Sequence, residues 1–166
     1  MIEKMNRNRV KARMLSGSAR QTEDVAREMA ERLRAGDILG LSGELGSGKT
    51  CFTGGLARGL GVSETYRITS PTFTLINEYP ARVKLYHFDI YRINDYAELE
   101  DLGCEEYFNG EGIVVIEWAE KIAEKLPEDA FLITFEYIDE NQRKIVIDGP
   151  ADRLKELLND TKWEVD

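Results

Sequence analysis

The residues most able to do chemistry lie in a glycine-rich run, residues 43–50, which has the spacing G-x-x-x-x-G-K-[ST]. Glycines allow such a loop to fold around phosphate oxygens with its backbone N–H groups pointing inward. The lysine would face solvent and reach the β- and γ-phosphates of a nucleotide, and the next hydroxyl would bind Mg²⁺. The run predicts a nucleotide site formed by Gly43, Glu44, Leu45, Gly46, Ser47, Gly48, Lys49, Thr50 and the adjoining Cys51.

A second acidic group is needed to hold Mg²⁺ or its water ligands, and in P-loop NTPases this acid ends a buried apolar strand. Residues 113–116 form a continuous apolar run that is followed by Glu117 and Trp118. A carboxylate at such a place is unusual unless it is paired. We therefore expect Glu117 and Thr50 to hold the metal. The alternative is a glutamate that leaves the sheet and meets solvent.

Residues 87–92 carry ionisable side chains at alternate positions. On a strand, His87, Asp89 and Tyr91 would share one face of the sheet. Asp89 could then orient or deprotonate an attacking water, or hold a water bound to Mg²⁺. The alternative is an ordinary polar strand face with an ion pair to Arg92.

Two hydroxyl side chains, Ser70 and Thr72, flank a proline between the glycine-rich run and the 87–92 cluster. Hydroxyls in a loop at that place suit a switch segment that senses the γ-phosphate. The alternative is a plain turn in which the hydroxyls cap backbone groups.

The elements that must position these residues can be predicted from apolar periodicity and turn residues. Strands are expected at 10–14, 38–41, 66–69 and 113–116, and hairpins from 73–79 with 83–88 and from 131–138 with 144–147.

Helices are expected between these strands. A capping box of Ser18 and Gln21 begins one that Gly36 stops, and the others cover 49–60, 95–102 (closed by Gly103) and 151–158. Mixed strands and helices indicate an α/β fold. We expect one P-loop NTPase-type domain over residues 1–166, with a mixed parallel and antiparallel central sheet flanked by helices, and with residues 1–9 as a flexible basic extension.

The chain has 31 acidic and 22 basic residues, and its formal net charge is −9. This charge argues against direct grip on a nucleic-acid backbone, which requires Lys and Arg to displace counterions. Residues 1–20 nevertheless hold six Lys or Arg and one acid. They are either a frayed start with the solvent side of a strand, or an arm that touches RNA or an acidic partner.

Two cysteines and one histidine leave few ligands for a transition metal, and Cys51 and Cys104 fit no disulfide framework. Free thiols fit a reducing cytosol. No apolar run is long enough to cross a bilayer, and the start has no signal-peptide stretch. We expect a cytoplasmic protein without a membrane partner.

Four motifs in order, G-E-L-G-S-G-K-T, S-P-T-F, H-F-D-I-Y-R and I-E-W, closely resemble the TsaE (formerly YjeE) family. These are small P-loop ATPases of bacterial tRNA threonylcarbamoyladenosine modification. The resemblance covers roughly residues 12–150. The P-loop alone is generic, whereas the last two motifs together are far more specific.

The resemblance implies Mg²⁺-dependent binding and hydrolysis of ATP, with ADP as product. It implies a partner role beside a TsaB–TsaD pair, which performs the threonylcarbamoyl transfer, so that tRNA is met only through that complex. The matching positions are Lys49 and Thr50 for nucleotide and metal, Glu117 for Mg²⁺, Asp89 as an essential acid, Trp118 near the nucleotide, and Ser70 and Thr72 in the first switch.

Two other functions remain open: a small-molecule P-loop kinase, and a nucleotide-gated binding module with negligible turnover. A kinase usually needs a mobile lid with arginines, and after Glu117 the sequence offers only Arg143 and Arg153. Within residues 36–120 no arginine is clearly placed to act on a γ-phosphate. An ATPase of this kind is therefore expected to be slow alone and faster with its partners.

Overall fold

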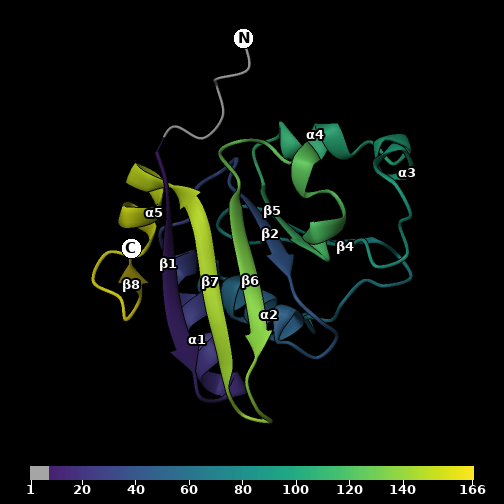
Figure 1. The fold of residues 1–166 in the computed structure, drawn as a ribbon. Helices are drawn as coiled ribbons and strands as arrows, with labels where there is room; N and C mark the ends of the chain where they lie inside the picture. The colour runs from purple at the N-terminus through teal and green to yellow at the C-terminus, as the bar shows by residue number, and fades with distance from the viewer. Residues whose placement is uncertain (1–7) are drawn as a thin grey trace.

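The computed structural model describes residues 8–166 and contains one eight-stranded sheet in the order β3-β4-β5-β2-β6-β7-β1-β8. Figure 1 shows the sheet with helices packed beside it. The strands are β1 (Arg9–Ser16), β2 (Ile38–Ser42), β3 (Ile76–Tyr79), β4 (Leu85–Asp89), β5 (Ile113–Glu117), β6 (Phe131–Tyr137), β7 (Arg143–Pro150) and β8 (Glu164–Val165). The predicted α/β fold with a mixed sheet is confirmed.

The centre of the sheet is parallel: β4 pairs with β5, β5 with β2, and β2 with β6. Every residue of β5 is buried, and β2 is buried except for Ser42 at its end. Strands covered on both faces read as continuous apolar runs, which explains the two runs seen in the sequence. Parallel pairing also brings the carboxyl ends of β2, β4 and β5 to the same edge of the sheet.

The two sides of the sheet are antiparallel. β3 pairs with β4, and β6, β7, β1 and β8 follow one another on the other side. Both predicted hairpins are confirmed.

Arg9, expected in the flexible extension, instead begins β1, where its guanidinium is bonded to the Asp148 carboxylate at 2.8 Å. Residues 1–7 of the expected extension lie outside the described residues.

The helices are α1 (Ala19–Ala30), α2 (Lys49–Gly59), α3 (Tyr96–Asp101), α4 (Cys104–Phe108) and α5 (Ala151–Leu157), with the short 3₁₀ turns η1 (Ala119–Lys121) and η2 (Ala123–Lys125). The Ser18 hydroxyl accepts from the Gln21 backbone N–H at the start of α1, as the capping box predicts. The helix ends at Ala30, before Gly36. Among residues 8–166, no helix combines the length and the apolar character needed to cross a bilayer.

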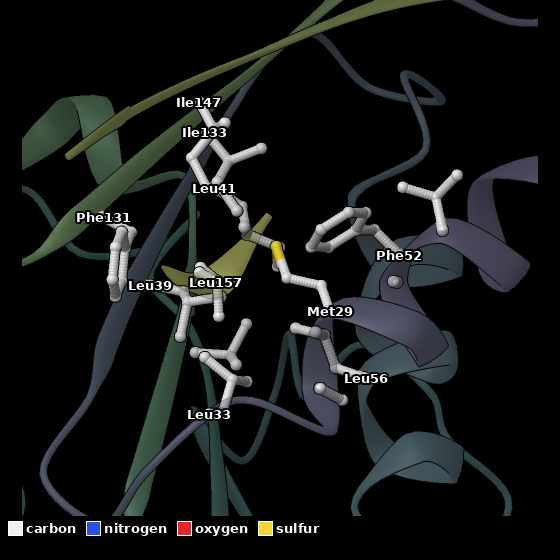
Figure 2. Close-up of a cluster of buried hydrophobic side chains, with 14 of the residues drawn as sticks. Met29, Leu33, Leu39, Leu41, Phe52, Leu56, Phe131, Ile133, Ile147 and Leu157 are labelled. Carbon is white, nitrogen blue, oxygen red and sulfur yellow. The ribbon is translucent and has the colours of Figure 1, made fainter. Parts of the chain in front are cut away.

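One apolar cluster lies between the sheet and helices α1, α2 and α5. In Figure 2, Met29 of α1 and Phe52 of α2 lie against the apolar side chains of β2 and β6. A second cluster covers the opposite face around β4 and β5, with α3, α4 and η1. The sheet is thus covered on both faces at the strands that carry the predicted acids.

Helices α1 and α2 lie side by side behind the strands in Figure 1, and two glycines of α2 permit this contact. A Cβ atom on Gly55 would lie 2.3 Å from the Glu23 carbonyl oxygen, and one on Gly59 would lie 2.4 Å from that of Arg27. The two glycines are one helical turn apart, so they form a single smooth face. The backbone of α1 therefore rests directly on α2, the helix that follows the glycine-rich loop.

Two expectations about local structure were wrong. Residues 66–69 form no strand, because β3 is the edge of the sheet and the Arg58 guanidinium binds the carbonyls of Ser63 and Tyr66 instead. Residues 73–75 belong to a turn before β3, so that hairpin is shorter than expected. Helix α4 and strand β8 were not predicted from the sequence, because they are too short to show periodicity.

We predict that Gly55→Ala destabilises the protein by about 1–3 kcal/mol, because the added methyl group must push α1 away from α2. Urea unfolding followed by circular dichroism measures this change. Gly54→Ala is the matched control: nothing lies within 4 Å of a Cβ there, so it should be neutral or slightly stabilising. Equal effects of the two substitutions would contradict the proposed close contact.

Candidate functional site

A cleft of about 430 Å³ opens at the edge of the sheet where β2, β4 and β5 end. Three separate parts of the chain line it: the glycine-rich loop with the start of α2, the loop before β3, and the ends of β4 and β5. The lining residues are Leu45, Gly46, Ser47, Gly48, Lys49, Thr50, Cys51, Ser70, Thr72, Asp89, Tyr91, Glu117 and Trp118. The structure therefore brings together most of the residues that the sequence singled out, whereas Gly43 and Glu44 do not line the cleft.

The loop between β2 and α2 has the backbone that its glycines predict. Gly46 and Gly48 have φ values of 75° and 109°, which are strained for other residues. A Cβ on Gly43 would lie 2.7 Å from the Ser47 hydroxyl oxygen and 2.8 Å from the Phe135 carbonyl oxygen. The loop opens directly into the first turn of α2, so the positive end of that helix faces the cleft.

Lys49 is buried, with 5% of its surface exposed, and the expectation of a solvent-facing cation was wrong. Its ammonium donates to the carbonyl oxygens of Gly43 and Glu44 and lies 4.0 Å from the centre of the Trp118 ring. Burial lowers the pKa of Lys49, and nearby carboxylates, Glu120 foremost, oppose that shift. The Lys49 ammonium is thus held by two backbone carbonyl dipoles and by the face of the Trp118 ring.

Glu117 is 2% exposed and its carboxylate is fully paired. Oε1 accepts from the Thr50 hydroxyl at 2.8 Å, and Oε2 accepts from His87 Nε2 at 2.6 Å and from the Ser70 hydroxyl at 3.0 Å. The side chain therefore stays in the sheet edge instead of leaving it for solvent. It joins the start of α2, the interior of β4 and the loop before β3.

Asp89 ends β4 directly opposite Glu117 and is also 2% exposed. Its Oδ2 accepts from the hydroxyls of Ser70 and, at 3.0 Å, Thr72, and its Oδ1 accepts from the Tyr91 backbone N–H at 2.9 Å. The Ser70 hydroxyl lies between the two carboxylates but carries one proton, so it can donate to only one of them at a time. Ser70 and Thr72 thus hold their loop onto the acid.

Two expectations for the 87–92 cluster differ from the structure. His87 and Asp89 share a face of β4, but Tyr91 lies beyond the end of the strand and is 53% exposed, with its ring 5.0 Å from that of Trp118. The Arg92 guanidinium lies 4.5 Å from the centre of the Phe73 ring, on the loop before β3. The alternative of an ordinary polar strand face with an ion pair to Arg92 is wrong, because His87 and Asp89 are buried and Arg92 forms no ion pair among residues 8–166.

Comparison with known proteins decides the family. The model of the family described as "Threonylcarbamoyl adenosine biosynthesis protein TsaE" matches residues 16–145. The chain belongs to the TsaE family. The resemblance inferred from four short motifs is confirmed, and residues 43–50 carry the P-loop motif within the matched region.

Several relatives cover most of both chains. The TsaE of Bacillus subtilis (strain 168) is 41% identical over 141 residues, or 84% of this chain and 87% of that one. The TsaE of Treponema pallidum (strain Nichols) is 41% identical over 135 residues, or 81% and 98%. The crystal structure of Bacillus subtilis YdiB superposes with a TM-score of 0.73 at 36% identity, covering 89% of this chain and 92% of that one.

Two features of this family member were missed from the sequence. Arg143, at the start of β7, donates from Nη2 to the carbonyl of Gly46 in the P-loop at 3.2 Å. His87 lies beneath Glu117, although the sequence showed it only as part of an ionisable cluster. Neither contact has a local signal, because the partners are far apart in the chain and are brought together only by the order of the strands in the sheet.

Cys51 follows Thr50 in α2, and its thiol points to the Ala19 carbonyl of α1 at 3.2 Å. Burial, with the negative charge of Glu23, raises the pKa of Cys51 to about 11. The group is therefore a thiol, not a reactive thiolate, at neutral pH. At the rim of the cleft it acts as a small, uncharged side chain.

We predict that Asp89→Ala loosens the loop that carries Ser70 and Thr72, because the Thr72 hydroxyl loses its acceptor and the Ser70 hydroxyl keeps only Glu117. Hydrogen exchange of the backbone amides in residues 70–76 should become about 10-fold faster, which is the effect of losing ~1.4 kcal/mol. Asp129→Ala, at an exposed acid, is the control. Unchanged exchange in the Asp89 variant would show that the loop is held by other contacts.

Proposed function

We propose that this protein binds ATP with Mg²⁺ and hydrolyses it to ADP and phosphate, and that this drives a step of tRNA threonylcarbamoyladenosine formation. One observation carries the chemistry: a P-loop and two buried, hydrogen-bonded carboxylates face each other across one cleft. The names of the relatives, "tRNA threonylcarbamoyladenosine biosynthesis protein TsaE", support the pathway.

The P-loop would bind the phosphates. Its inward N–H groups and the positive end of α2 attract anions at the floor of the cleft. Lys49 would leave the carbonyls of Gly43 and Glu44, which hold its charge in this structure, for the β- and γ-phosphate oxygens. Because Trp118 lies against the Lys49 ammonium, this movement would change the surroundings of the indole ring.

The donor set of the cleft fits Mg²⁺, which prefers oxygen ligands and is usually held by one or two carboxylates together with substrate phosphates. The Thr50 hydroxyl and the Glu117 carboxylate, already bonded to each other, would hold it. When bound, Mg²⁺ would neutralise charge that develops on the β- and γ-phosphates.

Asp89 would act on the water that attacks the γ-phosphate. Its carboxylate lies across the cleft from the P-loop, and the hydroxyls of Ser70 and Thr72 fix its orientation. An acid held in this way can orient the water or accept its proton at Oδ2. The same hydroxyls would make the loop responsive to whatever occupies the γ-phosphate position, as in a switch segment.

Turnover by the protein alone would be slow, because an arginine at the γ-phosphate accounts for a large part of P-loop catalysis. Among residues 8–166 no arginine lines the cleft: the Arg92 guanidinium lies over the Phe73 ring, and Arg143 donates to the carbonyl of Gly46. A TsaB–TsaD-like pair would supply the missing charge or order the loop at Ser70. With a net charge of −9, the protein would meet tRNA only through that pair, in the cytoplasm.

The kinase alternative is disfavoured by the segment after β5. Residues 118–130, where an arginine-bearing lid would close over the phosphates, contain no arginine and form two short 3₁₀ turns. A nucleotide-gated binding module with negligible turnover would need the same cleft as an ATPase. Measuring the release of phosphate from ATP distinguishes the two functions.

We predict that Lys49→Ala weakens ATP binding by about 100-fold or more, because a charged hydrogen-bond donor to the phosphates is lost. Titration with a fluorescent ATP analogue measures the affinity. Lys125→Ala, at an exposed lysine, should bind like the wild type. Unchanged affinity in the Lys49 variant, with its fold intact by circular dichroism, would remove the P-loop from the proposal.

We also predict that phosphate release from ATP is slow for the protein alone and rises about 10³-fold or more with a TsaB–TsaD pair. Asp89→Ala should bind ATP normally and lose about 10²–10⁴-fold of the stimulated rate. Transfer of the phosphate to a small molecule would favour the kinase, and no release under any condition would favour the binding module. Stimulation by tRNA but not by the pair would contradict the proposed partner.

A further inference from the structure

His87 is the only histidine of the chain and is fully buried, yet the function proposed above assigns it no role. It lies within β4, opposite Val115 of β5 and two residues before Asp89. Its Nε2 atom is 2.6 Å from Oε2 of Glu117, and its Nδ1 atom has no hydrogen-bond partner among residues 8–166. The single polar contact of this side chain is therefore the carboxylate of the expected metal ligand.

The pairing indicates where the imidazole proton lies. An ionised carboxylate only accepts hydrogen bonds, so Nε2 must carry the proton that joins it to Glu117. A second proton on Nδ1 would leave a buried N–H donor without an acceptor. The geometry therefore fixes the tautomer with a proton on Nε2 and none on Nδ1.

Glu117 depends on this donor because its other partners do not fix it fully. The Ser70 proton is shared with Asp89, which has the shorter contact, so Oε2 cannot rely on it. The Thr50 hydroxyl bonds to Oε1 alone. Among residues 8–166, the imidazole held in β4 is the donor to Oε2 that no other acceptor shares, and it thereby keeps Oε1 turned toward Thr50.

We propose that His87 is a positioning residue that orients the Glu117 carboxylate for Mg²⁺. An apolar side chain would fill the same buried site without leaving an unpaired nitrogen, so the cost of Nδ1 is offset only by the bond to Glu117. The inference rests on the proposed function, in which Glu117 holds the metal. It adds that the affinity of the site for Mg²⁺ depends on a residue that does not line the cleft.

The test compares ADP binding with Mg²⁺ and with EDTA, by calorimetry on the full chain without a histidine tag. In the wild type, Mg²⁺ should strengthen ADP binding. His87→Leu should lower the affinity for Mg²⁺–ADP by about 10–100-fold, the usual effect of losing a partner of a metal ligand, and leave ADP binding in EDTA nearly unchanged. His87→Gln, whose amide can place an N–H near the position of Nε2, should restore most of the difference.

A purely structural role predicts other results. If both variants lower the melting temperature and weaken binding equally with and without Mg²⁺, His87 only fills space and the proposal is wrong. It is also wrong if His87→Leu keeps the full effect of Mg²⁺. If His87→Leu does not fold, the His87→Gln variant is the test. The proposal then requires that His87→Gln binds Mg²⁺–ADP far more tightly than Glu117→Ala does.

A nucleotide-independent measurement separates this inference from the proposed function. Because His87 is the only histidine, its two ring nitrogens give isolated signals in a ¹⁵N NMR spectrum. We expect a protonated Nε2 and a bare Nδ1, with the Nε2 signal shifted by Glu117→Ala. The opposite tautomer, or no effect of Glu117→Ala, would overturn the inference. A wild type that binds no nucleotide but shows these signals would contradict only the proposed function.

Discussion

The parallel pairing of β4, β5 and β2 is the constraint on which the rest of the site depends. It aligns three strand ends at one edge, so that Asp89 lies opposite Glu117 and the P-loop begins beside them. Continuous apolar runs on β2 and β5 make this order stable, since both faces of the sheet are covered there. A slip of one residue in β4 would turn both His87 and Asp89 to the opposite face, and would separate Asp89 from the loop that carries Ser70 and Thr72.

Two carboxylates that are only 2% exposed would be costly if they were not paired. Hydrogen-bond donors from separate segments offset the cost of burying these carboxylates. They are Thr50 from α2, His87 from β4, and Ser70 and Thr72 from the loop before β3. The same bonds that solvate the acids therefore also fix the loop and the start of α2. The hydrogen bonds that allow the two carboxylates to be buried are therefore the same bonds that order the cleft.

Helix α2 and the loop before it are held from two further directions. On one side α1 rests on the glycine face of α2, and on the other Arg143 of β7 bonds to Gly46 in the P-loop. Lys49 is meanwhile stabilised by carbonyls of its own loop and by the Trp118 ring. The P-loop is thus pre-formed by packing, and its lysine has a defined resting position within reach of the cleft.

Local patterns in the sequence were enough to predict the P-loop, the acid at the end of an apolar strand, the capped first helix, both hairpins and the mixed sheet. The local elements depend on residues close together in the chain, where spacing sets geometry, and the mixed sheet was inferred from the succession of strands and helices. The buried position of Lys49, the shared proton of Ser70, the bond from His87 to Glu117 and the contact of Arg143 with Gly46 were decided only by the tertiary structure. These features join segments whose separation is fixed by strand order and register, and neither composition nor periodicity specifies which buried polar atoms will meet.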